Sequence, residues 1–91
     1  MKAFPESLEK YKQTPIFTEE TVPAGLLSEH NTKAGVWGKI IVLEGELDYT
    51  IPSQNNQTFQ LSPNRFGVVE PLVLHSVKPK GKVRFYVEFY K

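Results

Sequence analysis

Residues 30–49 read HNTKAGVWGKIIVLEGELDY and contain the longest apolar segment of the chain, together with one of its two histidines. Residues 36–43 are largely apolar on both faces of an extended strand, which is typical of a strand in the centre of a sheet. Gly45 follows this run, and residues 47–51 then alternate between apolar and polar. A glycine between two β-rich runs indicates a tight turn. The stretch therefore predicts a β-hairpin that turns at Glu44-Gly45.

Short β-rich segments continue outside this stretch at intervals of roughly ten residues, separated by prolines and glycines. They cover residues 16–22, 58–61, 65–69, 74–77 and 83–89. The sequence KPKG at residues 78–81 predicts a turn between the last two. Because no helical periodicity of useful length is present, the pattern predicts an all-β fold without a substantial helix. A sandwich or a closed or nearly closed antiparallel barrel is the expected architecture.

The length of 91 residues predicts one domain over residues 1–91. Residues 1–15 are expected to form a short N-terminal arm, because Pro5 and Pro15 leave room only for an extended segment or one helical turn. Hydrophobic residues make up 40% and charged residues 23% of the chain, a composition that excludes disorder.

Charge and composition also exclude several classes of partner. The net charge of +1 gives no reason to expect nucleic acid or an anionic membrane. The chain has no cysteine, which excludes disulfides and thiolate metal sites. No segment approaches the roughly 20 apolar residues of a membrane span, and the N-terminus lacks a signal-peptide core. A cytoplasmic protein is therefore expected.

Several motifs resemble those of cupin proteins. The run VLEGEL at residues 42–47 resembles the end of the first cupin motif, and the run from Gly67 to Pro71 followed by His75 resembles the second. A narrower set of motifs is similar to the TehB/YeaR-like small cupin domain family, which is linked to tellurite resistance. These motifs are HNTK at 30–33, Gly35, WG at 37–38, VEP at 69–71, His75 and FY at 89–90. The resemblance implies a cupin-like (RmlC-like) jelly roll that can hold a metal and that forms a homodimer.

The sequence departs from the general cupin pattern at the first motif. That pattern has two histidines and a glutamate there, whereas this chain has only His30, and Gly38 lies near the place of the glutamate. His75 matches the histidine of the second motif. The methyltransferase part of TehB is not recognisable in these residues, so methylation of tellurite is not expected of this chain.

Two imidazoles and a carboxylate suffice to hold one divalent ion with open positions. We expect His30 and His75 as nitrogen ligands and Glu70 as the third ligand, with Glu88 as its alternative. The two histidines are 45 positions apart, and the fold is expected to bring them together. The sequence does not distinguish zinc, iron, nickel and manganese. The alternative interpretation is that both histidines only form hydrogen bonds at the rim of a barrel.

Trp37 and Tyr49 are candidates for lining an apolar pocket, with core packing as the alternative for Trp37. Lys33 is a candidate contact for an anion, or a solvated loop lysine. We expect a metal- or small-ligand-binding protein whose ligand is a small molecule or an oxyanion. The resemblance links it to tellurite, oxyanion or metal stress. A metal-dependent dioxygenase or isomerase and a metal-free dimeric scaffold are the alternatives.

Overall fold

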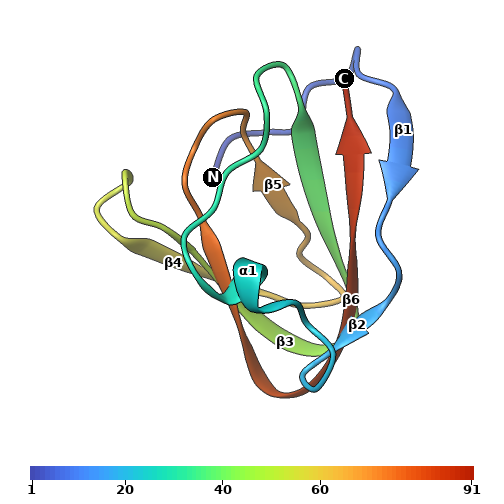
Figure 1. Ribbon diagram of the computed structural model, residues 1–91, viewed down its shortest axis with the longest axis vertical. Coiled ribbons are helices and arrows are strands. Elements are labelled where there is room, and N and C mark those ends of the chain that lie inside the picture. The colour runs from blue at the N-terminus through green and yellow to red at the C-terminus, as the bar shows by residue number, and fades with distance from the viewer.

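The computed structural model describes all residues from Met1 to Lys91 (Figure 1). It contains six strands and one short helix. In chain order these are β1 (Lys10–Gln13), β2 (Phe17–Thr18), α1 (Ala24–Leu27), β3 (Trp37–Ile51), β4 (Gln57–Leu61), β5 (Gly67–Val69) and β6 (Ser76–Tyr90). The helix has four residues, and no helix of the structure is long and apolar enough to cross a membrane.

The strands form one antiparallel sheet built on two long strands, β3 and β6. These strands pair along almost their whole length, from Trp37 opposite Tyr90 to Thr50 opposite Ser76. The path of the sheet is β1-β6-β3-β4, with β2 added to β6 and β5 added to β3. The all-β, antiparallel prediction is therefore confirmed. In Figure 1 the segment between α1 and β3 runs beside the segment that leads into β6, to which it is joined by backbone hydrogen bonds.

The predicted hairpin at Glu44-Gly45 is wrong, because β3 runs through this point without turning back. Its pairing with β6 shifts register there, so the irregularity is a β-bulge. Gly45 has a φ of +79°, and a Cβ at this position would collide with the carbonyl oxygen of Lys82. The glycine is therefore needed for a bend within a strand, where β3 lies directly against β6.

The predicted turn at residues 78–81 is also wrong, because these residues lie inside β6. Gly81 has a φ of +74° and lies in the same irregular part of the β3–β6 pair as Gly45. At the other end of the chain, the segment expected as a strand over residues 16–22 keeps strand pairing only in β2. The N-terminal arm contributes β1, which pairs with the end of β6.

The bend has a direct consequence for the core. Before it, Ile40 and Val42 point inward, and after it Leu47, Tyr49 and Ile51 do. The inward positions thus change from even to odd numbers, which is what an inserted residue does to a strand of period two. These five side chains belong to one buried cluster that also includes Phe59, Leu61, Val69, Val77, Val83 and Phe85.

Candidate functional site

The two histidines of the chain lie opposite each other in an isolated antiparallel bridge. The backbone N–H of His30 donates to the carbonyl oxygen of His75 at 3.0 Å, and the N–H of His75 donates to the carbonyl oxygen of His30 at 2.9 Å. Their ring centroids are 4.1 Å apart, with the rings inclined edge to face at 62°. The structure thus brings together two residues that are 45 positions apart in the sequence.

Each imidazole has its Nδ1 atom 3.0 Å from a backbone carbonyl oxygen, that of Ser28 for His30 and that of Val73 for His75. A carbonyl oxygen only accepts hydrogen bonds, so Nδ1 must carry the proton in both rings. In the neutral tautomer this leaves a lone pair on Nε2. The local backbone therefore fixes both rings as hydrogen-bond acceptors at Nε2.

His75 is deeply placed, with 4% of its surface exposed. Burial lowers the pKa of its imidazole to about 4, and the nearby His30 ring adds to this effect, while the hydrogen bond to the Val73 carbonyl opposes it. The buried ring of Tyr49 lies 5.8 Å from the ring of His75, and its hydroxyl donates to the carbonyl oxygen of Val68 at 2.8 Å. His75 is consequently neutral at physiological pH.

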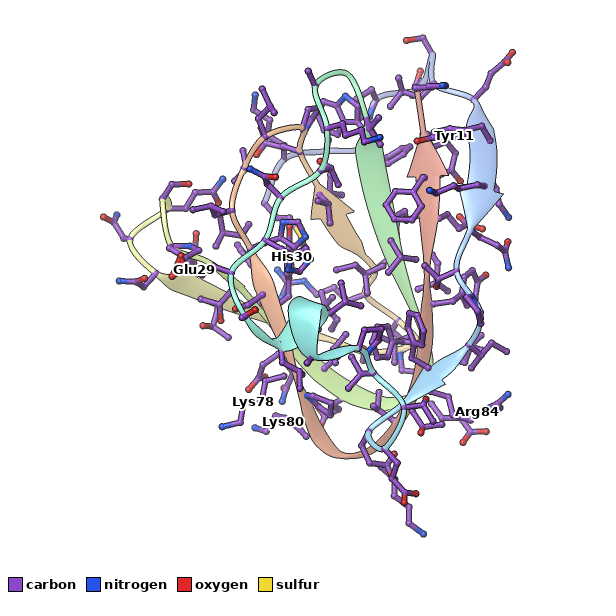
Figure 2. The ribbon with its side chains drawn as sticks, in the orientation of Figure 1. Tyr11, Glu29, His30, Lys78, Lys80 and Arg84 are labelled. Atoms are coloured by element: carbon purple, nitrogen blue, oxygen red, sulfur yellow. The ribbon has the colours of Figure 1, made fainter.

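Both histidines line a cavity of about 250 Å³. Its apolar wall includes Leu26 of α1, Val36, Ile40 of β3, and Val77, Phe85 and Val87 of β6. Its polar side consists of Tyr11, Lys12, Thr14, Asn31, Thr32 and Lys33. Figure 2 shows His30 pointing from its loop toward the sheet, whereas Lys78, Lys80 and Arg84 lie lower in the view and point outward. The cavity is therefore mostly apolar, with two imidazoles in its wall.

The two carboxylates expected as metal ligands are engaged elsewhere. The carboxylate of Glu70 lies 3.4 Å from the ammonium of Lys2 and accepts a hydrogen bond from Gln54 at 3.4 Å. No three histidine, aspartate or glutamate side chains are grouped so that they could hold one ion. The histidines meet as expected, but without a carboxylate beside them.

Glu88, the alternative ligand, points to the outer face of β6. It pairs with Lys10 at 3.0 Å and accepts a hydrogen bond from the hydroxyl of Tyr90 at 2.9 Å. Partial burial raises the pKa of Glu88, but these two hydrogen bonds and the charge of Lys10 outweigh it and bring the pKa below its usual value. Glu88 is therefore an ionised partner of the N-terminal arm.

Of the three residues expected at the pocket, one lines the cavity and two do not. Lys33 does line the cavity, whereas Trp37 and Tyr49 are absent from its wall. The ring of Trp37 lies 6.3 Å from that of Phe4 in the N-terminal arm. Tyr49 is part of the buried core. Both belong to β3, but Trp37 falls on its outer face and Tyr49 lies beyond the bulge, on the inward face.

Sequence reasoning missed most of the cavity wall. Tyr11, Lys12 and Thr14 come from the arm, and nothing in the sequence indicates that this arm folds over the end of β6. The alternation of Val83, Phe85 and Val87 with polar residues does indicate an inward face of this strand, and part of that face lines the cavity.

Comparison with known proteins identifies the family of this chain. Residues 12–87 match the TehB-like domain. Over 72 residues the chain is 35% identical to a probable S-adenosyl-L-methionine-dependent methyltransferase TehB of Haemophilus influenzae Rd, and 33% identical to the TehB of Haemophilus influenzae strain 10810. These matches cover 75% of this chain and 25% of each relative. The chain thus spans about a quarter of the length of the curated relatives it matches.

Two solved structures have the same fold. The crystal structure of TehB from Haemophilus influenzae superimposes with a TM-score of 0.83 at 31% identity, covering 93% of this chain and 32% of that one. A crystal structure of an Escherichia coli K12 protein gives a TM-score of 0.88 at 22% identity, covering 100% of this chain and 97% of that one. At this identity the second likeness concerns the fold alone.

These findings correct the function expected from the sequence. The relatives are named as probable S-adenosyl-L-methionine-dependent methyltransferases, which overturns the expected metal- or small-ligand-binding protein of oxyanion or metal stress, together with its dioxygenase, isomerase and scaffold alternatives. The divalent ion expected as cofactor is wrong for the same reason, and the histidine pair lacks a third ligand. What the motifs at residues 30–38 and 67–75 did identify is the family. The chain belongs to the TehB-like domain family.

Proposed function

We propose that this chain works in S-adenosylmethionine-dependent methyl transfer, as the module that holds the small molecule to be methylated. The observation that carries the proposal is the cavity at His30 and His75, in a chain related to methyltransferases over only a quarter of their length. In this proposal the methyl donor binds to a methyltransferase domain outside the residues described here.

The cavity matches S-adenosylmethionine itself poorly. It is a nucleoside with an amino-acid chain, and ligands of that size occupy pockets of roughly 300–1,000 Å³, whereas this cavity measures about 250 Å³. Nucleotide-binding sites commonly use an aspartate or glutamate for the ribose hydroxyls, and neither residue type lines the cavity. A methyl acceptor is a better match, because it can be much smaller than the donor.

The shape of the cavity supports a small organic acceptor. A dry cavity of about 150 Å³ is enough to bind benzene, so 250 Å³ accommodates a substituted six-membered ring. Val36, Phe85 and Val87 provide an apolar wall, and the imidazoles provide fixed polar atoms. Ligand sites typically combine an apolar lining with a few placed polar groups.

The finer description of the fold also belongs to the proposal. We propose a jelly roll, in which β3 and β6 each contribute to both halves of a folded sheet. The opposed irregularities at Gly45 and Gly81, and the addition of β5 to one half of β3 and β4 to the other, support it. Pairing does not join β4 to β1, so the sheet is open between these strands.

The proposal is tested by following backbone amide resonances of the chain by NMR. The protein is titrated separately with S-adenosylmethionine and with 4-methylphenol, 4-methylbenzenethiol and 4-methylaniline as small acceptors. We expect at least one acceptor to shift the amides of residues 30–33 and 75, and S-adenosylmethionine to leave them unchanged. Shifts of these amides by S-adenosylmethionine, or by none of the acceptors, contradict the proposal.

A further inference from the structure

The polar atoms that remain available inside the cavity determine which ligands it can hold. Thr14 and Thr32 line it, but their hydroxyls are already used. The Thr14 hydroxyl donates to the carbonyl oxygen of Pro15 and accepts from the N–H of Val87, and the Thr32 hydroxyl lies within hydrogen-bond distance of the carbonyl oxygens of Val36 and Glu70. These threonines therefore hold the cavity wall together.

The imidazole of His75 has an unused acceptor. Its Nδ1 is bonded to the Val73 carbonyl, and its Nε2 has no partner within the chain. Every fully buried side-chain nitrogen or oxygen in the structure does have a partner, so Nε2 must be accessible. His75 lines the cavity and is otherwise almost fully enclosed, which means that Nε2 is reached from the cavity.

His30 repeats this arrangement on the opposite strand of the bridge. Its Nδ1 is bonded to the Ser28 carbonyl, which leaves Nε2 as the acceptor. The paired backbone hydrogen bonds of the bridge fix the two rings 4.1 Å apart. The cavity wall thus has two adjacent imidazoles held by backbone geometry, each with a lone pair on Nε2.

The charge state of His75 follows from its buried position beside His30. Burial keeps the pKa of His75 at about 4, and the closeness of the two rings disfavours a second positive charge. At neutral pH the buried ring therefore accepts a hydrogen bond and does not donate one from Nε2. A carboxylate or another anion at Nε2 of His75 would face this lone pair with its own, which is repulsive, so an anion would have to be held by Lys12 or Lys33 on the polar side of the cavity.

We propose that the cavity selects a small, neutral, mostly apolar molecule that donates one O–H, S–H or N–H hydrogen bond to Nε2 of His75. This inference rests on the proposed function, and it narrows the acceptor to the protic class, such as a phenol, an aromatic thiol or an arylamine. The methylated product lacks the donor when the methyl group replaces the only hydrogen on an oxygen or sulfur. The site then discriminates between the molecule before and after methylation.

The test compares ligands of one shape that differ in a single group. Dissociation constants for the intact chain are measured by NMR titration with 4-methylphenol, 4-fluorotoluene, 4-methylanisole and 4-methylbenzoate. Fluorine resembles a hydroxyl in size but cannot donate, the anisole is the methyl ether, and the benzoate is the anion. Because one neutral hydrogen bond contributes a few-fold to tenfold in affinity, we expect 4-methylphenol to bind about three- to tenfold more tightly than 4-fluorotoluene, with weaker binding of the other two.

The ring nitrogens of His75 provide a second, independent measurement. A long-range proton–nitrogen spectrum should show the Nε2 resonance moving with 4-methylphenol and remaining fixed with 4-fluorotoluene. In His75→Phe, which keeps a ring of similar size, the preference for the phenol should fall to about one. If that variant does not fold, the Nε2 resonance of the unmodified protein decides.

The outcomes separate the two proposals. Equal affinity for 4-methylphenol and 4-fluorotoluene, or a preference for 4-methylbenzoate, overturns the inference about a protic ligand and leaves the proposed acceptor module intact. Failure of all four molecules to shift residues 30–33 and 75 overturns both.

Discussion

At the scale of single residues, His75 controls the chemistry of the site. Its ring is buried, its Nδ1 proton is committed to a backbone carbonyl, and its pKa is about 4. A histidine in an unfolded chain has a pKa near 6.5. Between these pH values the folded protein binds fewer protons than the unfolded chain, so folding stability should depend on pH through this residue.

The stability contributed by neutral His75 is complete above pH 6.5 and is lost as the pH falls toward 4. The difference between the two pKa values corresponds to roughly 3 kcal/mol. We therefore expect the free energy of unfolding in urea to fall by about 2–3 kcal/mol more between pH 7 and pH 4.5 in the unmodified protein than in His75→Gln. Carboxylates titrate in both proteins and cancel in the comparison. An equal fall in the two proteins would show that burial does not perturb His75.

At the scale of elements, the long β3–β6 pair explains the charge pattern of the chain. Residues 44, 46 and 48 of β3 are acidic, and the register places them opposite Arg84, Lys80 and Lys78 of β6. Opposite charges facing each other across strands stabilise a sheet modestly, and like charges destabilise it. Arg84 and Glu44 form the one ion pair of this set within 4 Å, at 3.2 Å. The basic residues of β6 thus face the acidic residues of β3 along the strand pair.

The bend of the β3–β6 pair depends more strongly on Gly45 than on Gly81. Both glycines have positive φ, but a Cβ on Gly45 would collide with the backbone of Lys82, while a Cβ on Gly81 would have no atom within 4 Å. Gly81→Ala should cost only the left-handed backbone conformation, about 1–2 kcal/mol. Gly45→Ala should cost clearly more, because the two strands must separate. Chemical denaturation of both variants measures the difference, and equal losses would mean that the close approach at Gly45 can relax.

At the scale of the whole molecule, the sequence predicted the fold class and the family, but two bends within strands were interpreted as turns between strands. Glycine after a β-rich run is compatible with a hairpin or with a bulge, and the pattern around Gly45 does not separate them. A hairpin and a bulge would both change the inward-facing positions from even numbers, as at Val42, to odd numbers, as at Leu47. Only the partner strand resolves the choice, since β6 runs past both halves of β3.

The candidate site was predictable to a similar extent. His30 and His75 are the only histidines, and their motifs indicated that they meet. The roles of Glu70 and Glu88 were not predictable, because each is held by a lysine of the N-terminal segment, Lys2 and Lys10. The expected homodimer stays a prediction, and light scattering of the purified chain measures it.

In the function proposed here, the cavity holds the methyl acceptor and not the methyl donor. The most direct measurement uses Haemophilus influenzae TehB in which residues 12–87 of this chain replace the matching segment. Release of S-adenosylhomocysteine is followed at varied donor and acceptor concentrations, with the most active acceptor from a panel of phenols, thiols and amines. Val36→Phe fills the cavity, and Leu43→Phe on the exposed face of β3 serves as its control.

Loss of one binding contact appears in the KM of the ligand that uses it. We expect Val36→Phe to raise the KM for the acceptor by about tenfold or more and to change the KM for S-adenosylmethionine by less than about twofold, with both unchanged in Leu43→Phe. A rise in the KM for S-adenosylmethionine with no change for the acceptor would contradict it.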